Sequence, residues 1–140
     1  MLIQNAIKIT ENHPEEFFLV SEHQHHYNSY KFKSGESVAV DGGTAYTRRS
    51  FSTKSNYGTD WMEWCLDSEE PFYTIKNRLL WGTRGKDGKQ QLKYVRLVTC
   101  ETDHLENILK ELVWRKNGSE VRQIYIDVIE DILSDRKFVE

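Results

Sequence analysis

The hydrophobic positions in the first third of the chain come in short runs separated by polar residues. Between residues 2 and 50 these runs are rich in Val, Ile, Tyr and Phe, which is typical of β-strands. Turn residues such as Ser34-Gly35 and Asp41-Gly-Gly43 separate the runs. The pattern predicts a small antiparallel sheet with strands at residues 2–10, 16–22, 27–33, 37–41 and 45–50.

Further strands are predicted in the middle of the chain. Residues 60–67 contain two tryptophans, a methionine and a leucine, which favours a buried strand. The apolar runs at 79–83 and 92–98 flank Asp87-Gly88, a strong turn signal, and therefore predict a β-hairpin.

Helical patterns lie between and after these strands. A short helix is expected from a cap at Ser68, with Pro71 in its first turn, to about Arg78. Two longer helices are expected to begin at Thr102-Asp103 and Ser119-Glu120, because apolar residues then recur at helical spacing.

Together the elements predict an α+β protein with an N-terminal antiparallel β-sheet, a central helix and β-hairpin, and a C-terminal αα-hairpin. The 140 residues suit a single domain, 1–140. Residues 52–60 are polar and lack periodicity, which makes them the candidate subdomain seam.

Composition narrows the class of protein. With 38% hydrophobic and 12% aromatic residues the chain is expected to be ordered and soluble. A net charge of -3 gives no general attraction to nucleic acid, so that class of partner is not favoured. No long apolar run or signal-like start occurs, and Cys65 and Cys100 are far apart, so we expect no membrane contact and a cytoplasmic location.

Three of the five histidines, His23, His25 and His26, lie close together in the sequence. Imidazole is a common ligand of transition metals, and Asp41 could complete a metal site with them. In the alternative interpretation the histidines are hydrated loop residues and Asp41 serves the turn before Gly42. Whether a metal binds is left open, and no other cofactor is expected.

Residues Tyr46, Arg48 and Arg49 follow the Asp41-Gly-Gly43 turn. Arginine binds phosphate or carboxylate through paired hydrogen bonds, and turn amides could assist it. With His25 or His26 as acid and base, this set could support phosphodiester cleavage. The alternative is that the adjacent arginines point to opposite faces of a strand.

The basic residues Arg84, Lys86 and Lys89 flank the turn of the predicted hairpin. Their spacing is not that of a phosphate-binding loop, and the segment precedes a strand. We expect a hairpin tip that could contact an acidic partner or a nucleic-acid backbone.

The four tryptophans are expected to belong to one core. Trp114 is the exception, because it lies beside the main helical stripe and could either cover the helix hairpin or be exposed for a partner.

Two segments, Ser21-Glu-His-Gln-His-His-Tyr27 and Val40-Asp-Gly-Gly-Thr-Ala-Tyr-Thr-Arg-Arg49, resemble a family of small domains from bacteriophage and bacterial genomes. Its members carry S-x-H-x-H and V-D-G-G-x-x-Y-x-R-R motifs, often with cysteine pairs that look like a zinc ribbon. Those cysteines are absent from residues 11–16 and 32–35 here, so the resemblance implies a metal-free sheet. Residues 81–94 and 102–109 resemble a module of the same kind of phage protein.

We therefore expect a phage-type accessory binding protein in the cytoplasm of the host cell, and whether it also catalyses a reaction is left open. It would engage a host protein or a nucleotide-containing ligand and could counteract a host system. The rival functions are a metal-dependent or histidine-based phosphodiesterase and, more weakly, a nucleic-acid-binding module. The expected contacts are His23, His25, His26, Asp41, Tyr46, Arg48, Arg49, Arg84, Lys86 and Lys89.

Overall fold

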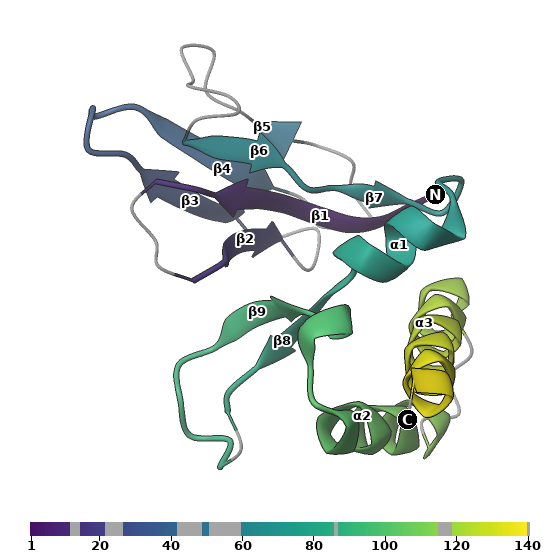
Figure 1. Ribbon diagram of the computed structural model, residues 1–140. Helices are drawn as coiled ribbons and strands as arrows, with labels where there is room; N and C mark the ends of the chain where they lie inside the picture. The colour runs from purple at the N-terminus through teal and green to yellow at the C-terminus, as the bar shows by residue number, and fades with distance from the viewer. Residues whose placement is uncertain are drawn as a thin grey trace. The chain divides into compact units, whose positions relative to one another are not determined.

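The computed structural model describes residues 1–11, 15–21, 27–41, 49–50, 60–85, 87–114 and 119–139. It confirms the α+β class, with an N-terminal antiparallel sheet and a C-terminal pair of helices (Figure 1). The elements are β1 Leu2–Ile9, β2 Phe17–Ser21, β3 Tyr27–Lys31, β4 Ser37–Asp41, β5 Arg49–Ser50, β6 Trp61–Glu63, β7 Leu66–Asp67, α1 Phe72–Arg78, β8 Leu80–Thr83, β9 Lys93–Arg96, a 3-10 helix Leu97–Thr99, α2 Thr102–Trp114 and α3 Glu120–Val139.

The chain divides into two compact units. Unit 1 comprises Met1–Glu69 and Leu80–Val95, and unit 2 comprises Glu70–Leu79 and Arg96–Glu140. The single domain therefore stays a prediction, and residues 52–59 of the expected seam lie outside the described residues.

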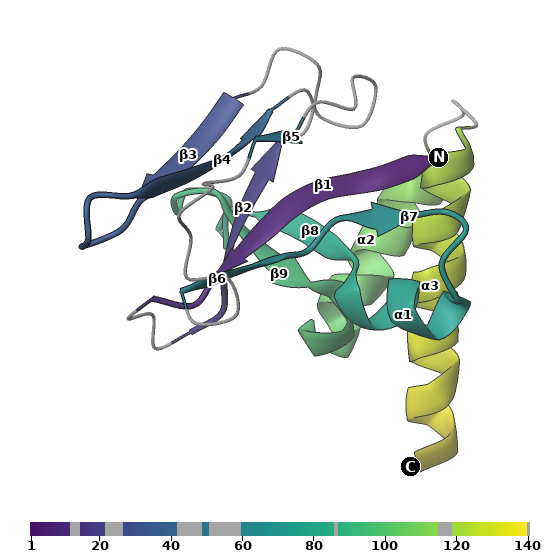
Figure 2. The same cartoon turned by 90° about the horizontal axis from the view of Figure 1, so that it is seen from above.

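Strand β1 is the centre of unit 1. It pairs antiparallel with β2 along one edge and with β6 and β7 along the other. The strands β3, β4 and β5 form a second antiparallel sheet, and β8 pairs with β9 (Figure 2). The predicted strand at 60–67 is interrupted, because Trp64 leaves the ladder after donating its N–H to the Ala6 carbonyl at 2.9 Å.

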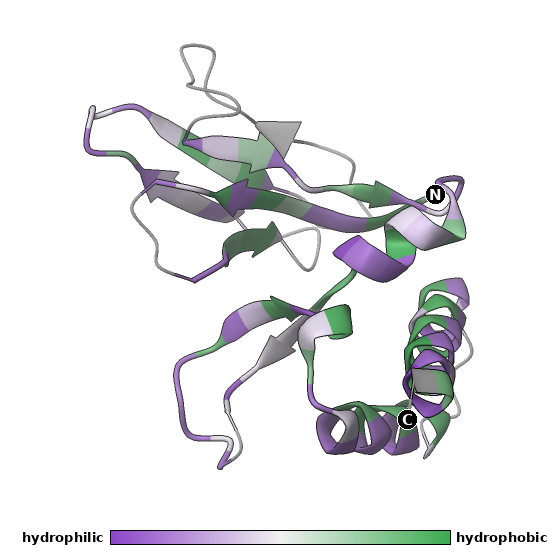
Figure 3. Cartoon of the chain, in the orientation of Figure 1, coloured by the Kyte–Doolittle hydropathy of each residue, from purple (hydrophilic) through white to green (hydrophobic). Residues whose placement is uncertain are grey.

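The two faces of the β1–β2 pair bury different cores. On one face Ile7, Ile9 and Leu19 pack with Trp61 and with residues of the second sheet such as Val40. On the other face Ala6, Phe18 and Val20 pack with Leu80 of β8, and Tyr94 of β9 lies against them. Most of β2 is therefore hydrophobic, although it lies at one end of the β2–β1–β6 sheet (Figure 3).

Two buried amides on β1 join the parts of unit 1. Gln4 donates to the Trp64 carbonyl at 2.9 Å and accepts from the Leu80 N–H at 2.8 Å. Asn5 donates to the Asp41 carbonyl of β4 at 3.0 Å and accepts from the Cys65 thiol at 3.4 Å. Because neighbouring strand residues point to opposite faces, one amide serves each side of the sheet.

Of the three turns predicted from glycine, those at Gly35 and Gly88 are confirmed, whereas Gly42 and Gly43 lie outside the described residues. Gly35 has φ 94 and closes the β3–β4 turn through its N–H to the Phe32 carbonyl at 3.0 Å. Gly88 has φ 70, next to Asp87, whose carboxylate accepts from the Lys89 N–H at 2.9 Å. Positive φ values are low in energy for glycine because it has no Cβ.

The cap predicted for α1 is wrong. The helix begins at Phe72 behind Pro71, makes no side-chain cap hydrogen bond, and has no acidic residue in its first turn. Ser68 lies earlier, where its N–H donates to the Met1 carbonyl at 2.7 Å. The predicted end at Arg78 is confirmed.

Cationic side chains hold unit 2 together. Arg136 of α3 donates to the Cys100 carbonyl at 2.6 Å and to the Thr102 hydroxyl at 3.0 Å, next to the start of α2. Arg122 donates to the Leu112 carbonyl at 2.6 Å near the other end of α2. Lys76 of α1 pairs with Asp131 and Asp135 of α3, and these carboxylates raise the pKa of its ammonium group.

In the described part of the chain, no helix combines the length and apolarity that crossing a membrane requires.

Replacing Asn5 by Ala should lower the free energy of unfolding by about 2 kcal/mol, because the fully buried Asn5 amide bonds both the Asp41 carbonyl and the Cys65 thiol. Urea denaturation measures this change. Asn28→Ala is the control, since the Asn28 side chain is only half-buried and its bond to the Val20 carbonyl is longer, at 3.4 Å. We expect that variant to lose less than about 1 kcal/mol. If both variants lose the same free energy of unfolding, Asn5 does not contribute more to stability than Asn28, and the prediction is wrong.

Arg136→Met should lower the free energy of unfolding of unit 2 by about 2 kcal/mol, because the variant keeps most of the side-chain stem but loses the hydrogen-bond donors. Lys137→Met is the matched control on the exposed surface of α3 and should change stability by less than about 0.5 kcal/mol. Hydrogen exchange of the α2 amides reports the change, and unaltered exchange in Arg136→Met would refute the role.

Candidate functional site

Most of the histidine and arginine site predicted from the sequence falls outside the described residues. His23, His25, His26, Tyr46 and Arg48 all do, so their convergence stays a prediction. The two remaining members lie on strands of the second sheet. Asp41 ends β4 opposite Tyr27, and Arg49 pairs with Val40. Within the described residues, no group of three or more His, Cys, Asp or Glu side chains could hold a metal ion.

The basic segment between β8 and β9 is a hairpin tip, as expected. Arg84 and Lys89 are exposed there, and Lys86 lies outside the described residues. The Arg84 carbonyl accepts from the Gln90 N–H at 2.9 Å, which closes the loop onto itself.

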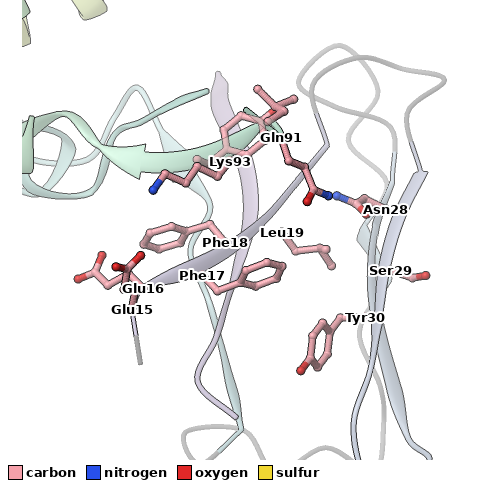
Figure 4. Close-up of a pocket in the computed structure, with 12 residues that line it drawn as sticks. Glu15, Glu16, Phe17, Phe18, Leu19, Asn28, Ser29, Tyr30, Gln91 and Lys93 are labelled. Carbon is pink, nitrogen blue, oxygen red and sulfur yellow. The ribbon is translucent and has the colours of Figure 1, made fainter. Parts of the chain in front are cut away.

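A groove of about 520 Å³ lies in unit 1, and it was not predicted from the sequence. It is lined by residues 15–19 at β2, residues 28–30 of β3 and residues 91–94 at β9 (Figure 4). All three segments belong to unit 1. The volume falls within the range of sites for small ligands and short peptides, about 300–1,000 Å³.

Aromatic rings form much of the groove wall. The Phe17 and Tyr30 rings are 5.9 Å apart and tilted by 54° (Figure 4). Tyr30 also contacts Phe32 edge-on, and Phe18 packs on Trp64. Phe17 remains 37% exposed, so a large apolar side chain is available to solvent at the groove. Exposed aromatic groups are typical anchor points of binding surfaces.

Polar groups lie around these rings. Glu15 and Glu16 lie together at one end, and Gln91 and Asn28 direct their amides toward one another at the other (Figure 4). Glu16 pairs with Lys8 at 3.8 Å. The groove thus combines an apolar floor with a polar rim.

Tyr30 is the groove residue with a shifted pKa. Burial raises the pKa of its phenol above the usual 10.0, and the Glu11 carboxylate adds to the shift by charge and by a hydrogen bond. Glu11 is itself held by the Lys33 N–H, 3.2 Å from each carboxylate oxygen. The phenol therefore stays neutral at physiological pH and donates its proton to Glu11, while its oxygen can accept a hydrogen bond.

Unit 2 exposes a separate apolar patch at the end of α2. Trp114 is 85% exposed and Val113 is 62% exposed, and both line a shallow hollow with Leu109. Of the two alternatives stated for Trp114, the structure shows the exposed one. The expectation of one core is wrong for Trp61 and Trp64, because they pack in the two different cores on either face of the β1–β2 pair. Trp61 is buried, whereas Trp64 and Trp81 are half-buried.

A partial signal for the groove exists in the sequence. Phe17 and Phe18 place two large apolar side chains on opposite faces of one strand. Each face must therefore either pack against another part of the protein or bind a partner. The sequence does not show that residues 91–94 approach this strand, because that contact links segments far apart in the chain.

No protein-family model, curated protein or solved structure matches this chain. The resemblance to phage domains therefore stays a prediction.

Glu11→Gln should lower the pKa of the Tyr30 phenol toward 10.0, because the negative charge that opposes ionisation is removed. NMR titration of the tyrosine ring carbons measures it, with Glu15→Gln as a control that leaves Tyr30 unchanged. The raised pKa also stabilises the fold fully below about pH 10, and this contribution is lost as pH rises through the folded value. An unchanged Tyr30 titration in Glu11→Gln would contradict the assignment.

Proposed function

We propose that this chain is a non-enzymatic binding protein that engages a partner protein through the groove of unit 1. The observation that carries the proposal is the aromatic groove of about 520 Å³ between β2, β3 and β9. Its exposed Phe17 suits an apolar anchor residue of a partner, and the oxygen of its neutral Tyr30 suits a hydrogen-bond donor.

A protein partner is favoured over a nucleotide-containing ligand by the geometry of the rings. Phe17 and Tyr30 contact each other at a tilt of 54°, which leaves no slot between parallel faces for a planar base. Both Glu15 and Glu16 at the rim also oppose a phosphate.

The resemblance to phage proteins supports the rest of the proposal. A phage protein of this kind would bind a host protein, and its role would be to counteract a host system. Arg84 and Lys89 at the exposed hairpin tip provide a second contact for an acidic surface of that partner.

Site-specific photo-crosslinking in living bacteria tests the proposal. Phe17→p-benzoylphenylalanine places the reactive group at the groove, and Tyr73→p-benzoylphenylalanine places it on exposed α1 of unit 2. We expect a protein adduct from the Phe17 position and none from the Tyr73 position.

A second substitution makes the test specific. Ser29→Arg adds a long side chain at an exposed groove position and should abolish the Phe17 adduct. Equal adducts from both positions, or none from Phe17, would overturn the proposal. An adduct destroyed by nuclease would favour the nucleotide-containing ligand.

A further inference from the structure

The direction of the main-chain groups of β2 follows from the hydrogen bonds of β1. The Ala6 carbonyl accepts from Trp64, and the Thr10 N–H donates to Asp60, both on the β6 side of β1. Main-chain groups of alternate residues point to alternate edges in an antiparallel ladder. Ile7 and Ile9 therefore bond toward β2, where their partners are Leu19 and Phe17.

It follows that Phe18 and Val20 direct their N–H and C=O groups away from β1. The Asn28 side chain confirms this direction, because its amide donates to the Val20 carbonyl at 3.4 Å. Among the described strands β2 pairs with β1 alone. No hydrogen bond from the described residues reaches the outward N–H and C=O of Phe18.

The groove lies along this same edge. Its lining includes Phe17 and Leu19 from one face of β2 and Phe18 from the other, so it opens at the edge and not on a single face. Such an edge, hydrophobic and without a neighbouring strand from the part of the chain that the structure describes, is a template for another chain.

We propose that the groove receives an extended peptide segment of the partner protein, which adds to the outer edge of β2 as a further strand. This inference rests on the proposed function and specifies its binding mode. Main-chain hydrogen bonds to Phe18 provide affinity, and pockets for alternate side chains provide selectivity.

The lining predicts the side chains of the segment. The residue opposite Phe18 projects toward Phe18 and Tyr94, whereas its two neighbours project toward Leu19 and Tyr30. All three positions therefore favour apolar residues. A volume of about 520 Å³ accommodates a few such residues.

The charge of the groove indicates one further residue of the bound segment. Lys8 partly neutralises Glu16 at 3.8 Å, whereas Glu15 is exposed and has no ion pair among the described residues. A lysine or arginine of the segment at this end would complement the two carboxylates. The occupant is thus an apolar strand with a basic residue at one end.

Selection from a displayed library of linear random peptides on the full-length protein provides the probe. We expect the selected peptides to share consecutive apolar residues and a basic residue. The tightest is then synthesised, together with a copy N-methylated at its central apolar residue, which keeps the side chains but removes a main-chain donor.

Hydrogen exchange at the Phe18 amide is the decisive measurement. It should slow by about a hundredfold at peptide concentrations near 100 times Kd, because a partner strand now bonds that amide. Glu15→Lys should weaken peptide binding about fivefold. Glu106→Lys, at an exposed position of α2, is the control: it makes the same charge change and should leave the peptide affinity unchanged. The N-methylated copy should bind at least about tenfold more weakly.

The outcomes separate this inference from the proposed function. Peptides that shift the resonances of Ser29 and Tyr30 but leave Phe18 exchange unchanged would overturn strand addition and keep the groove as the binding site. If the library yields no peptide that binds at the groove, but the Phe17 position still gives a protein adduct in cells, strand addition is likewise overturned and the groove remains the binding site. If neither the peptide selection nor the crosslinking detects binding at the groove, both proposals are wrong. If the protein forms a concentration-dependent dimer in which Phe18 exchange slows without peptide, the strand that adds to β2 comes from a second copy of this chain.

Discussion

Two adjacent amide side chains, Gln4 and Asn5, determine how unit 1 can be assembled. Both are buried, and each satisfies its polar atoms on main-chain or thiol groups of other segments. A slip of β1 by one residue would exchange their faces and leave buried donors and acceptors without partners. The register of β1 is therefore held by hydrogen-bonding requirements in addition to the hydrophobic pattern.

The position of β1 explains why a groove exists. Because β6 and β7 occupy one edge of β1, β2 takes the other edge and is the last of the described strands in its sheet. Asn28 links β3 to β2 through the Val20 carbonyl, and Phe17, Phe18 and Tyr30 line the space nearby. The outward groups of Phe18 are a consequence of the same alternation that pairs Leu19 with Ile7.

Unit 2 is held by a different kind of contact. Its apolar residues Leu105, Ile108 and Ile129 are buried, but arginine donors also join the helices to carbonyls at their ends. Helix carbonyls near the C-terminus lack intrahelical partners, so Arg122 supplies at the Leu112 carbonyl what the helix itself lacks.

The sequence by itself determined the features that depend on neighbouring residues. The turns at Gly35 and Gly88, the strand β4 and the helix α3 follow from local periodicity and from the conformational freedom of glycine. The expected cap at Ser68 failed because the helix begins only at Phe72, and the Ser68 N–H instead bonds Met1, a contact that local sequence does not encode. The groove was decided by tertiary structure alone, because it requires β2, β3 and β9 to meet, and which strand is left with a free edge depends on pairing across the whole sheet.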